Sequence, residues 1–189
     1  MKYYKLLYDY ENDDNSILLE IDEATLGFDQ YDIEKDISSL KLSNSIIVNY
    51  DDVKDKMVTD YVVNDLIWFI ATEKFKVVIK SVDDKNIQFY QLVAKSINCD
   101  SKHIFFLVNI CNVIDGLDLD SSKCSVYESD DGVKMMSIQK YAIRLNAIKE
   151  YNLFRLKDDY VSIFASEKMK KAIEKAGITG CDFLEVKVV

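Results

Sequence analysis

The chain has 189 residues and 49% of them are hydrophobic, which suits one domain with a sizeable core or two small lobes. Its formal net charge is -9, and the first 65 residues alone hold 16 acidic against 6 basic side chains. This acidity argues against nucleic acid as a partner, and no segment has the roughly 20 apolar residues of a membrane span, so no membrane partner is expected either.

The cysteines and the single histidine, His103, do not form a ligand motif. The four cysteines are widely spaced, whereas zinc ligands usually come in close pairs, so the sequence predicts no metal and no cofactor. At the start, Lys2, Lys5 and Asp9 stand where a signal peptide needs an uninterrupted apolar run. We therefore expect a cytoplasmic protein with free thiols.

Alternation of apolar and polar residues predicts three strands in the first part of the chain, at Lys2–Tyr8, Ile17–Ile21 and Ser45–Asn49. The pattern of Asp22–Asn44, between the second and the third, is ambiguous. Residues 1–65 form an acidic N-terminal part that differs in charge from the core at residues 66–189. No linker is expected between the two parts, because the chain has no proline and few glycines. We expect one compact unit overall.

A first amphipathic helix is predicted after Thr72. Apolar residues recur from Phe75 to Val82 at spacings of three and four, Thr72 supplies a capping oxygen, and Glu73 places an acid in the first turn. A strand, Ile87–Ala94, is expected to follow this helix.

Further strands are predicted through the second half of the chain. The run at Ile104–Ile114 is apolar on both faces and indicates a central strand or a buried helix, and its β-branched and aromatic content favours the strand. Asp131 with Gly132 marks a hairpin turn between strands at Cys124–Glu128 and Val133–Ser137. The alternation from Tyr141 to Leu145 suggests another strand, and a second hairpin is expected around residues 157–159.

A second amphipathic helix repeats the first. FASEKMKKAIEKA matches IATEKFKVVIKSV at an offset of 94 residues, with Ser166 as the cap and Gly177 as the expected left-handed residue at the end. Phe183 and Phe89 keep the same offset in the strands that follow. Two readings stay open: convergence of two capped helices, or a duplicated strand-helix-strand unit. The predicted fold class is α+β, with a mostly antiparallel or mixed sheet carrying two capped helices.

The densest carboxylate cluster outside the first 65 residues is Asp115, Asp118 and Asp120. These residues could bind a divalent cation, but the glycine and the closing glutamate of a standard calcium loop are missing. The other interpretation is a solvated loop whose aspartates cap backbone N–H groups. With one histidine and no nucleophile motif, the sequence indicates no catalytic residue. A small metal-dependent or hydrolytic enzyme using the three aspartates is the alternative hypothesis.

From Asp60 to Val189, the order of short sequence motifs resembles that of a family of bacterial immunity proteins from polymorphic toxin systems, first catalogued as a domain of unknown function. The resemblance rests on an Asn-Asp-Leu-Asp arrangement, a Phe-Arg-Leu run and an Ile-Thr-Gly run. The residues of these motifs are Asn109, Asp115, Leu117, Asp118, Phe154, Arg155, Leu156, Ile178, Thr179, Gly180 and Phe183.

This resemblance implies a protein that binds and neutralises a cognate toxin encoded by an adjacent gene. It transfers no catalytic residue and implies that the motif residues maintain the fold, Arg155 by pairing with a loop aspartate. An inhibitor should present exposed charged and aromatic side chains. The candidate toxin-binding residues are therefore Asp51, Asp52, Asp55, Asp60, Tyr31, Tyr50 and Tyr61.

If the toxin is a nuclease, those carboxylates could occupy its basic groove as phosphate mimics. The other interpretation of the acidic residues is an ordinary solvated surface that keeps the protein soluble.

Overall fold

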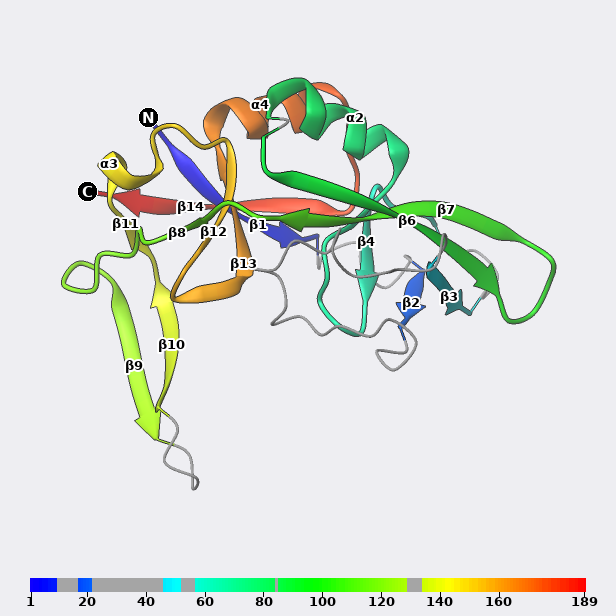
Figure 1. Cartoon of the computed structure of the whole chain (residues 1–189), viewed down its shortest axis with the longest axis horizontal. Helices are drawn as coiled ribbons and strands as arrows, with labels where there is room; N and C mark the ends of the chain where they lie inside the picture. The colour runs from blue at the N-terminus through cyan, green and yellow to red at the C-terminus, as the bar shows by residue number, and fades with distance from the viewer. Residues whose placement is uncertain (10–16, 22–45, 52–56, 84, 129–133) are drawn as a thin grey trace.

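The computed structural model describes residues 1–9, 17–21, 46–51, 57–83, 85–128 and 134–189. These residues form a six-stranded sheet, a closed barrel, a separate two-stranded hairpin and three helices, so the predicted α+β class is confirmed (Figure 1). The ambiguous stretch 22–44 and the turn at Asp131 and Gly132 lie outside the described residues.

The six-stranded sheet places the first strand of the chain between two strands from its end. Its spatial order is β11 (Ala142–Ile143), β14 (Cys181–Val188), β1 (Tyr3–Tyr8), β13 (Asp159–Ser166), β12 (Leu153–Leu156) and β8 (Val113–Ile114). Both neighbours of β1 are antiparallel to it, and β12 and β13 form the hairpin predicted around residues 157–159.

The barrel is built around one long antiparallel ribbon. Its spatial order is β2 (Leu18–Glu20), β3 (Ile46–Tyr50), β6 (Ile87–Ser96), β7 (Lys102–Ile110), β5 (Ile70–Ala71) and β4 (Tyr61–Asn64), closed by the parallel pairing of β2 with β4. Residues 1–65 thus supply strands to both sheets, so the difference in charge at residue 65 does not separate two independent sheets.

The predicted run Ile104–Ile114 is divided between the two sheets. β7 ends at Ile110 and the chain continues as β8, in the other sheet. Between them Asn112 is buried, and its amide nitrogen donates to the carbonyl oxygens of Leu153 and Lys85. This side chain replaces strand hydrogen bonds at the crossing, which hydrophobicity alone could not predict.

The two predicted helices, α2 (Glu73–Val82) and α4 (Glu167–Lys175), are confirmed with their caps. Thr72 Oγ1 accepts from the backbone N–H of Phe75, and Ser166 Oγ accepts from that of Met169. Gly177 follows α4 with φ +61°, the left-handed conformation expected there. A short helix, α3 (Leu145–Ile148), replaces the end of the strand predicted from Tyr141 to Leu145.

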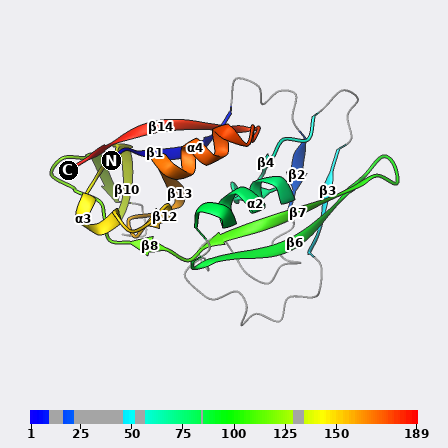
Figure 2. The ribbon, with the colours of Figure 1, turned by 90° about the horizontal axis from the view of Figure 1, so that it is seen from above.

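α2 and α4 lie side by side over the two sheets and share one core (Figures 1 and 2). Phe75 and Ile79 of α2 pack in the same cluster as Met169 and Ile173 of α4, and all four side chains are at most 1% exposed. The helices therefore join the barrel and the six-stranded sheet into one unit, as burial of apolar surface drives their association.

Each helix connects two parallel strands that flank a third. α2 leads from β5 to β6 on either side of β7, and α4 leads from β13 to β14 on either side of β1. Phe89 and Phe183 are each the third residue of the strand after the helix, and both pack on the shared core. The units differ in their middle strand, because β7 follows its unit in the chain whereas β1 precedes its own.

The strands β9 (Lys123–Glu128) and β10 (Lys134–Lys140) form an antiparallel hairpin that extends away from both sheets (Figure 1). The hairpin predicted from the Asp-Gly pair is confirmed in its strands. Val126 and Tyr127 on β9 are 65% and 51% exposed, whereas Met136 and Ile138 pack against the core of the six-stranded sheet.

Candidate functional site

The structure distributes the candidate toxin-binding residues between surface and interior. Asp51 is exposed at the end of β3, and its Oδ1 accepts a hydrogen bond from Asn98 at 2.5 Å. Tyr31, Asp52 and Asp55 lie outside the described residues.

Asp60, Tyr50 and Tyr61 are buried, which corrects the expectation that they belong to an exposed face. Tyr61 stacks on Tyr8 with ring centroids 4.2 Å apart, and the hydroxyls of Tyr50 and Ser101 lie 2.6 Å apart. The sequence could not separate these tyrosines from surface tyrosines, because a tyrosine can be buried with its hydroxyl bonded.

Asp60 connects the start of α2 to the loop after α4. Its carboxylate accepts from the hydroxyl of Thr72 at 2.6 Å, from Lys74 Nζ at 2.9 Å and from the backbone N–H of Thr179 at 3.1 Å. Burial alone would raise the pKa of Asp60, but these donors outweigh it and hold the pKa below its ordinary value. This carboxylate stabilises the fold and is not available to a partner.

Several motif residues have clear structural contacts. Phe154 stacks on Phe164, Phe183 lies edge-on to Tyr4, and Asn109, which is 3% exposed, donates to Gln88 Oε1 at 2.9 Å.

Gly180 has φ +81°, and a Cβ on it would lie 2.5 Å from the carbonyl oxygen of Tyr61. The chain at residue 180 therefore passes too close to residue 61 for any side chain.

The expected pairing of Arg155 with a loop aspartate is wrong, because Arg144 takes that role. Arg144 Nη2 lies 2.6 Å from Asp115 Oδ1, while Arg155 Nη1 donates to the carbonyls of Tyr160 and Val161. Burial lowers the pKa of Arg155 to about 10. Arg155 enters the core at a register shift in β12, which sequence spacing does not indicate.

The carboxylates of the possible metal site also have local contacts. Asp115 is bound by Arg144, and Asp118 Oδ1 accepts from the backbone N–H of Ser121 at 2.8 Å. Within the described ranges, no three His, Cys, Asp or Glu side chains come together as metal ligands would.

A partly buried polar network crosses the six-stranded sheet. The Tyr141 hydroxyl donates to Asp159, Lys5 Nζ lies 3.4 Å from that hydroxyl, and Ser162 Oγ lies 3.3 Å from it. Burial and the hydrogen bond to Asp159 raise the pKa of Tyr141, and burial lowers the pKa of Lys5. The hydroxyls of Tyr141 and Ser162 take part in this network, which connects the residue before β11 to β1 and β13.

The most distinctive exposed surface lies on the outside of the barrel. α2 covers the first half of the β6–β7 ribbon, where Phe89 and Val108 are paired, and the ribbon extends beyond the helix (Figure 2). The outward residues beyond the helix include Gln91, Val93 and Lys95 on β6, Lys102 and Ile104 on β7, and Ile47 on β3. We call these six residues the barrel face.

Ile47, Val93 and Ile104 form one row across the barrel face, because Val93 pairs with Ile47 on one side and with Ile104 on the other. Ile47 and Ile104 are 53% and 57% exposed. Single exposed apolar residues are common, but three adjacent branched side chains on an open sheet face indicate a contact surface.

Lys95 and Lys102 stand directly opposite each other in the next outward row. Like charges at opposing positions repel, since their Cβ atoms are about 5 Å apart. Among the residues that the structure describes, neither lysine has a carboxylate within 4 Å. The barrel face therefore combines an apolar row with two lysines that form no ion pair within the described part of the chain.

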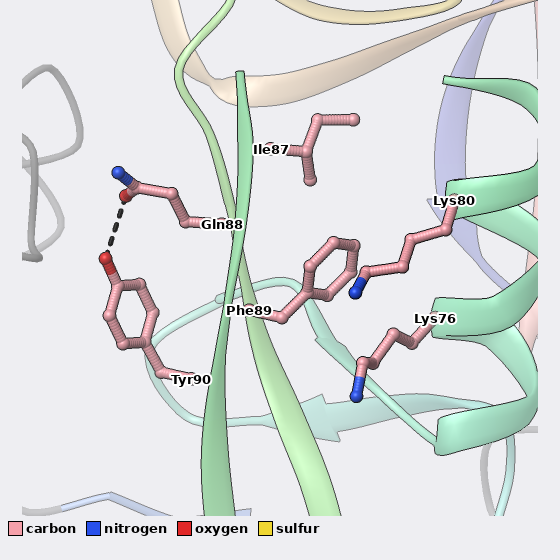
Figure 3. Close-up of a pocket in the computed structure, with 6 residues that line it drawn as sticks. All are labelled: Lys76, Lys80, Ile87, Gln88, Phe89 and Tyr90. Atoms are coloured by element: carbon pink, nitrogen blue, oxygen red, sulfur yellow. Dashed lines mark hydrogen bonds between the residues drawn. The ribbon is translucent and has the colours of Figure 1, made fainter. Parts of the chain in front are cut away.

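A hollow of about 600 Å³ adjoins this face between α2 and the start of β6 (Figure 3). Lys76 and Lys80 extend from α2 toward the side of β6 that carries Phe89, whereas Gln88 and Tyr90 lie on the other side of the strand. Lys76 Nζ lies 3.7 Å from the centroid of the Phe106 ring and 3.0 Å from Glu73 Oε2. The lining of the hollow therefore adds one further cation, Lys80, beside the barrel face, since the charge of Lys76 is paired with Glu73.

The barrel face is apolar and basic, whereas the residues that the sequence marked as candidates are acidic and aromatic. Alternation marks Val93 and Lys95 as one side of a strand, but it does not show that α2 stops short of them. The two lysines come together because β6 and β7 pair through a short turn at residues 97–101, which places Lys95 opposite Lys102.

A family model described as "Immunity protein family (Imm11)" matches residues 2–188. A comparison with curated proteins finds no match. No helix in the described part of the chain has the length and hydrophobicity needed to cross a membrane.

Proposed function

The chain belongs to the Imm11 immunity protein family, and from this membership we propose that it binds a cognate toxin protein and blocks the toxin's active surface. The observation that carries this proposal is the extent of the family match, which covers residues 2–188. The proposed partner is encoded by an adjacent bacterial gene, and the encounter takes place in the cytoplasm.

A finer proposal concerns the toxin's chemistry. The first 65 residues have a net charge of -10, which would speed the approach of a basic protein such as a nuclease. Asp51 is the exposed carboxylate of the candidate set within the described ranges, and Asp52 and Asp55 follow it in sequence. A nuclease target rests on this charge alone.

The inhibitor proposal is favoured over the enzyme alternative by the surroundings of the aspartates. Asp115 and Asp118 are engaged by Arg144 and by a backbone N–H, so the three carboxylates do not converge on one point. The barrel face places an apolar row beside charged side chains, the arrangement of an apolar centre and a polar rim found in protein interfaces.

Co-expression tests the proposal. The product of the adjacent gene should stop growth when induced alone, and growth should return when this chain is expressed with it. The two proteins should also purify together through a tag on either one. If the adjacent product is harmless alone, or remains toxic in the presence of the chain, the proposed function is wrong.

A further inference from the structure

We propose that the barrel face is the surface that contacts the toxin, and that the toxin presents there an apolar patch bordered by carboxylates. This inference rests on the proposed function and adds to it the contact surface and the chemistry of the partner. The acidic first part of the chain contributes attraction at a distance, while the barrel face contributes the contact itself.

The apolar row supplies the centre of the interface. Ile47, Val93 and Ile104 lie on three neighbouring strands, so they form a continuous patch held by backbone hydrogen bonds. Such a rigid patch loses little conformational entropy on binding, since its strands are already ordered. Its partner must be apolar, because a polar group facing these side chains would lose its hydrogen bonds to water.

The lysine pair defines the border of the partner patch. Lys95 and Lys102 repel each other in the free protein, and a carboxylate between them would relieve that repulsion and gain two charge-assisted contacts. Lys80, in the adjoining hollow, extends the positive charge along α2, while Lys76 is paired with Glu73. A partner with carboxylates at these points would therefore be selected over a neutral one.

Within the described ranges of the chain, the carboxylates around the barrel face lie at its margins. Glu20 is exposed on β2, two strands away from Lys95, and Asp51 and Asp100 are exposed near the tip of the ribbon. Glu73 is engaged by Lys76. None of these described carboxylates forms an ion pair with Lys95 or Lys102.

Charge also argues against two other occupants. A second copy bound face to face about a two-fold axis would add two more lysines to the same border, which like-charge repulsion disfavours. An anionic membrane would attract the lysines, but the net charge of -9 would oppose its approach. The favoured occupant is a protein surface with its own carboxylates.

The test measures binding of the adjacent gene's product to charge variants of the barrel face by surface plasmon resonance. The pair Lys95→Gln with Lys102→Gln should weaken binding several-fold, and Lys95→Glu with Lys102→Glu at least 100-fold, mainly by slowing association. The salt dependence of association should be flatter for the Gln pair than for the wild-type chain. Ile104→Ala should raise the dissociation rate.

A matched control exists on the β9–β10 hairpin, where Lys123 and Lys140 are also cross-strand partners. Changing both to Glu alters the net charge by the same amount, and binding should stay within twofold of wild type. Circular dichroism of every variant checks that it folds.

The outcomes separate the two proposals. If the wild-type chain binds and the Lys95 and Lys102 variants bind equally well, the barrel face is not the contact and the toxin-binding proposal stands. An equal loss in the hairpin control would assign the effect to net charge. If the wild-type chain does not bind, the proposed function fails and this inference falls with it. Binding of the wild-type chain to vesicles with anionic lipids, or a dimer abolished by the Glu pair, would assign the face to a membrane or to a second copy.

Discussion

At the scale of single residues, the positions that hold the fold are polar groups at close approaches. Asp60 accepts hydrogen bonds from the cap of α2, from Lys74 and from the loop at Thr179, and Gly180 lies against the backbone of residue 61. The sequence indicated that Gly180 is structural, through the family resemblance, but it placed Asp60 on the surface. A lone aspartate in an acidic stretch carries no sign of burial until its donors are known.

Asp60→Asn should destabilise the protein by about 2–3 kcal/mol, because charge-assisted hydrogen bonds to a buried carboxylate are lost. Urea unfolding at pH 7 measures this loss. Asp51→Asn is the control, since Asp51 is exposed, and should change stability by less than about 0.5 kcal/mol. Equal effects of the two substitutions would contradict the role given to Asp60.

The same contacts predict a pH dependence. Folding holds the pKa of Asp60 below its ordinary value of 3.8, so its contribution is fully present above that value and is lost as pH falls through the lower, folded pKa. Asp159, whose pKa is also lowered, acts in the same direction. Unfolding curves should show stability falling with acid, and less steeply in Asp60→Asn; parallel slopes would contradict the assignment.

Gly180→Ala and Gly177→Ala form a matched pair. Both glycines have positive φ, +81° and +61°, so each substitution costs about 1–2 kcal/mol for the backbone conformation. At Gly180 the new Cβ would also lie 2.5 Å from the Tyr61 carbonyl oxygen, whereas nothing lies within 4 Å at Gly177. Gly180→Ala should therefore lower the denaturation midpoint much further, and equal midpoints would show that the close approach does not exist.

At the scale of elements, local patterns predicted most of the structure. The caps at Thr72 and Ser166, the strands at both ends of the chain and the hairpin around residues 157–159 follow from periodicity and turn chemistry. The failures lie where tertiary contacts decide: the strand from Ile104 divides at Asn112, and α3 forms where alternation suggested a strand.

The β9–β10 hairpin should be the least stable of the described sheets. It has two strands, and most of the β9 side chains are exposed, so little apolar burial supports its hydrogen bonds. Hydrogen exchange followed by mass spectrometry should show faster exchange for peptides covering β9 than for peptides covering β1. Equal protection would mean that the hairpin packs more closely than its exposure indicates.

At the scale of the whole molecule, α2 and α4 join a barrel to a six-stranded sheet, and the ribbon of the barrel extends past α2 to form the barrel face. The fold class could be predicted because it follows from the helices and strands, which local sequence patterns indicate. The candidate site could not, since it depends on strand pairing across the barrel and on where α2 ends. Of the acidic set, Asp51 is the one member that the structure shows exposed, and the cationic barrel face was not anticipated.

The central claim is that one chain neutralises one toxin by occupying its active surface. Its most direct test is a titration of the purified product of the adjacent gene, with that protein's own activity as the readout. The account predicts that activity falls linearly as the chain is added and reaches zero near a molar ratio of one, at concentrations far above the dissociation constant. Full activity in the presence of excess, bound chain would contradict it.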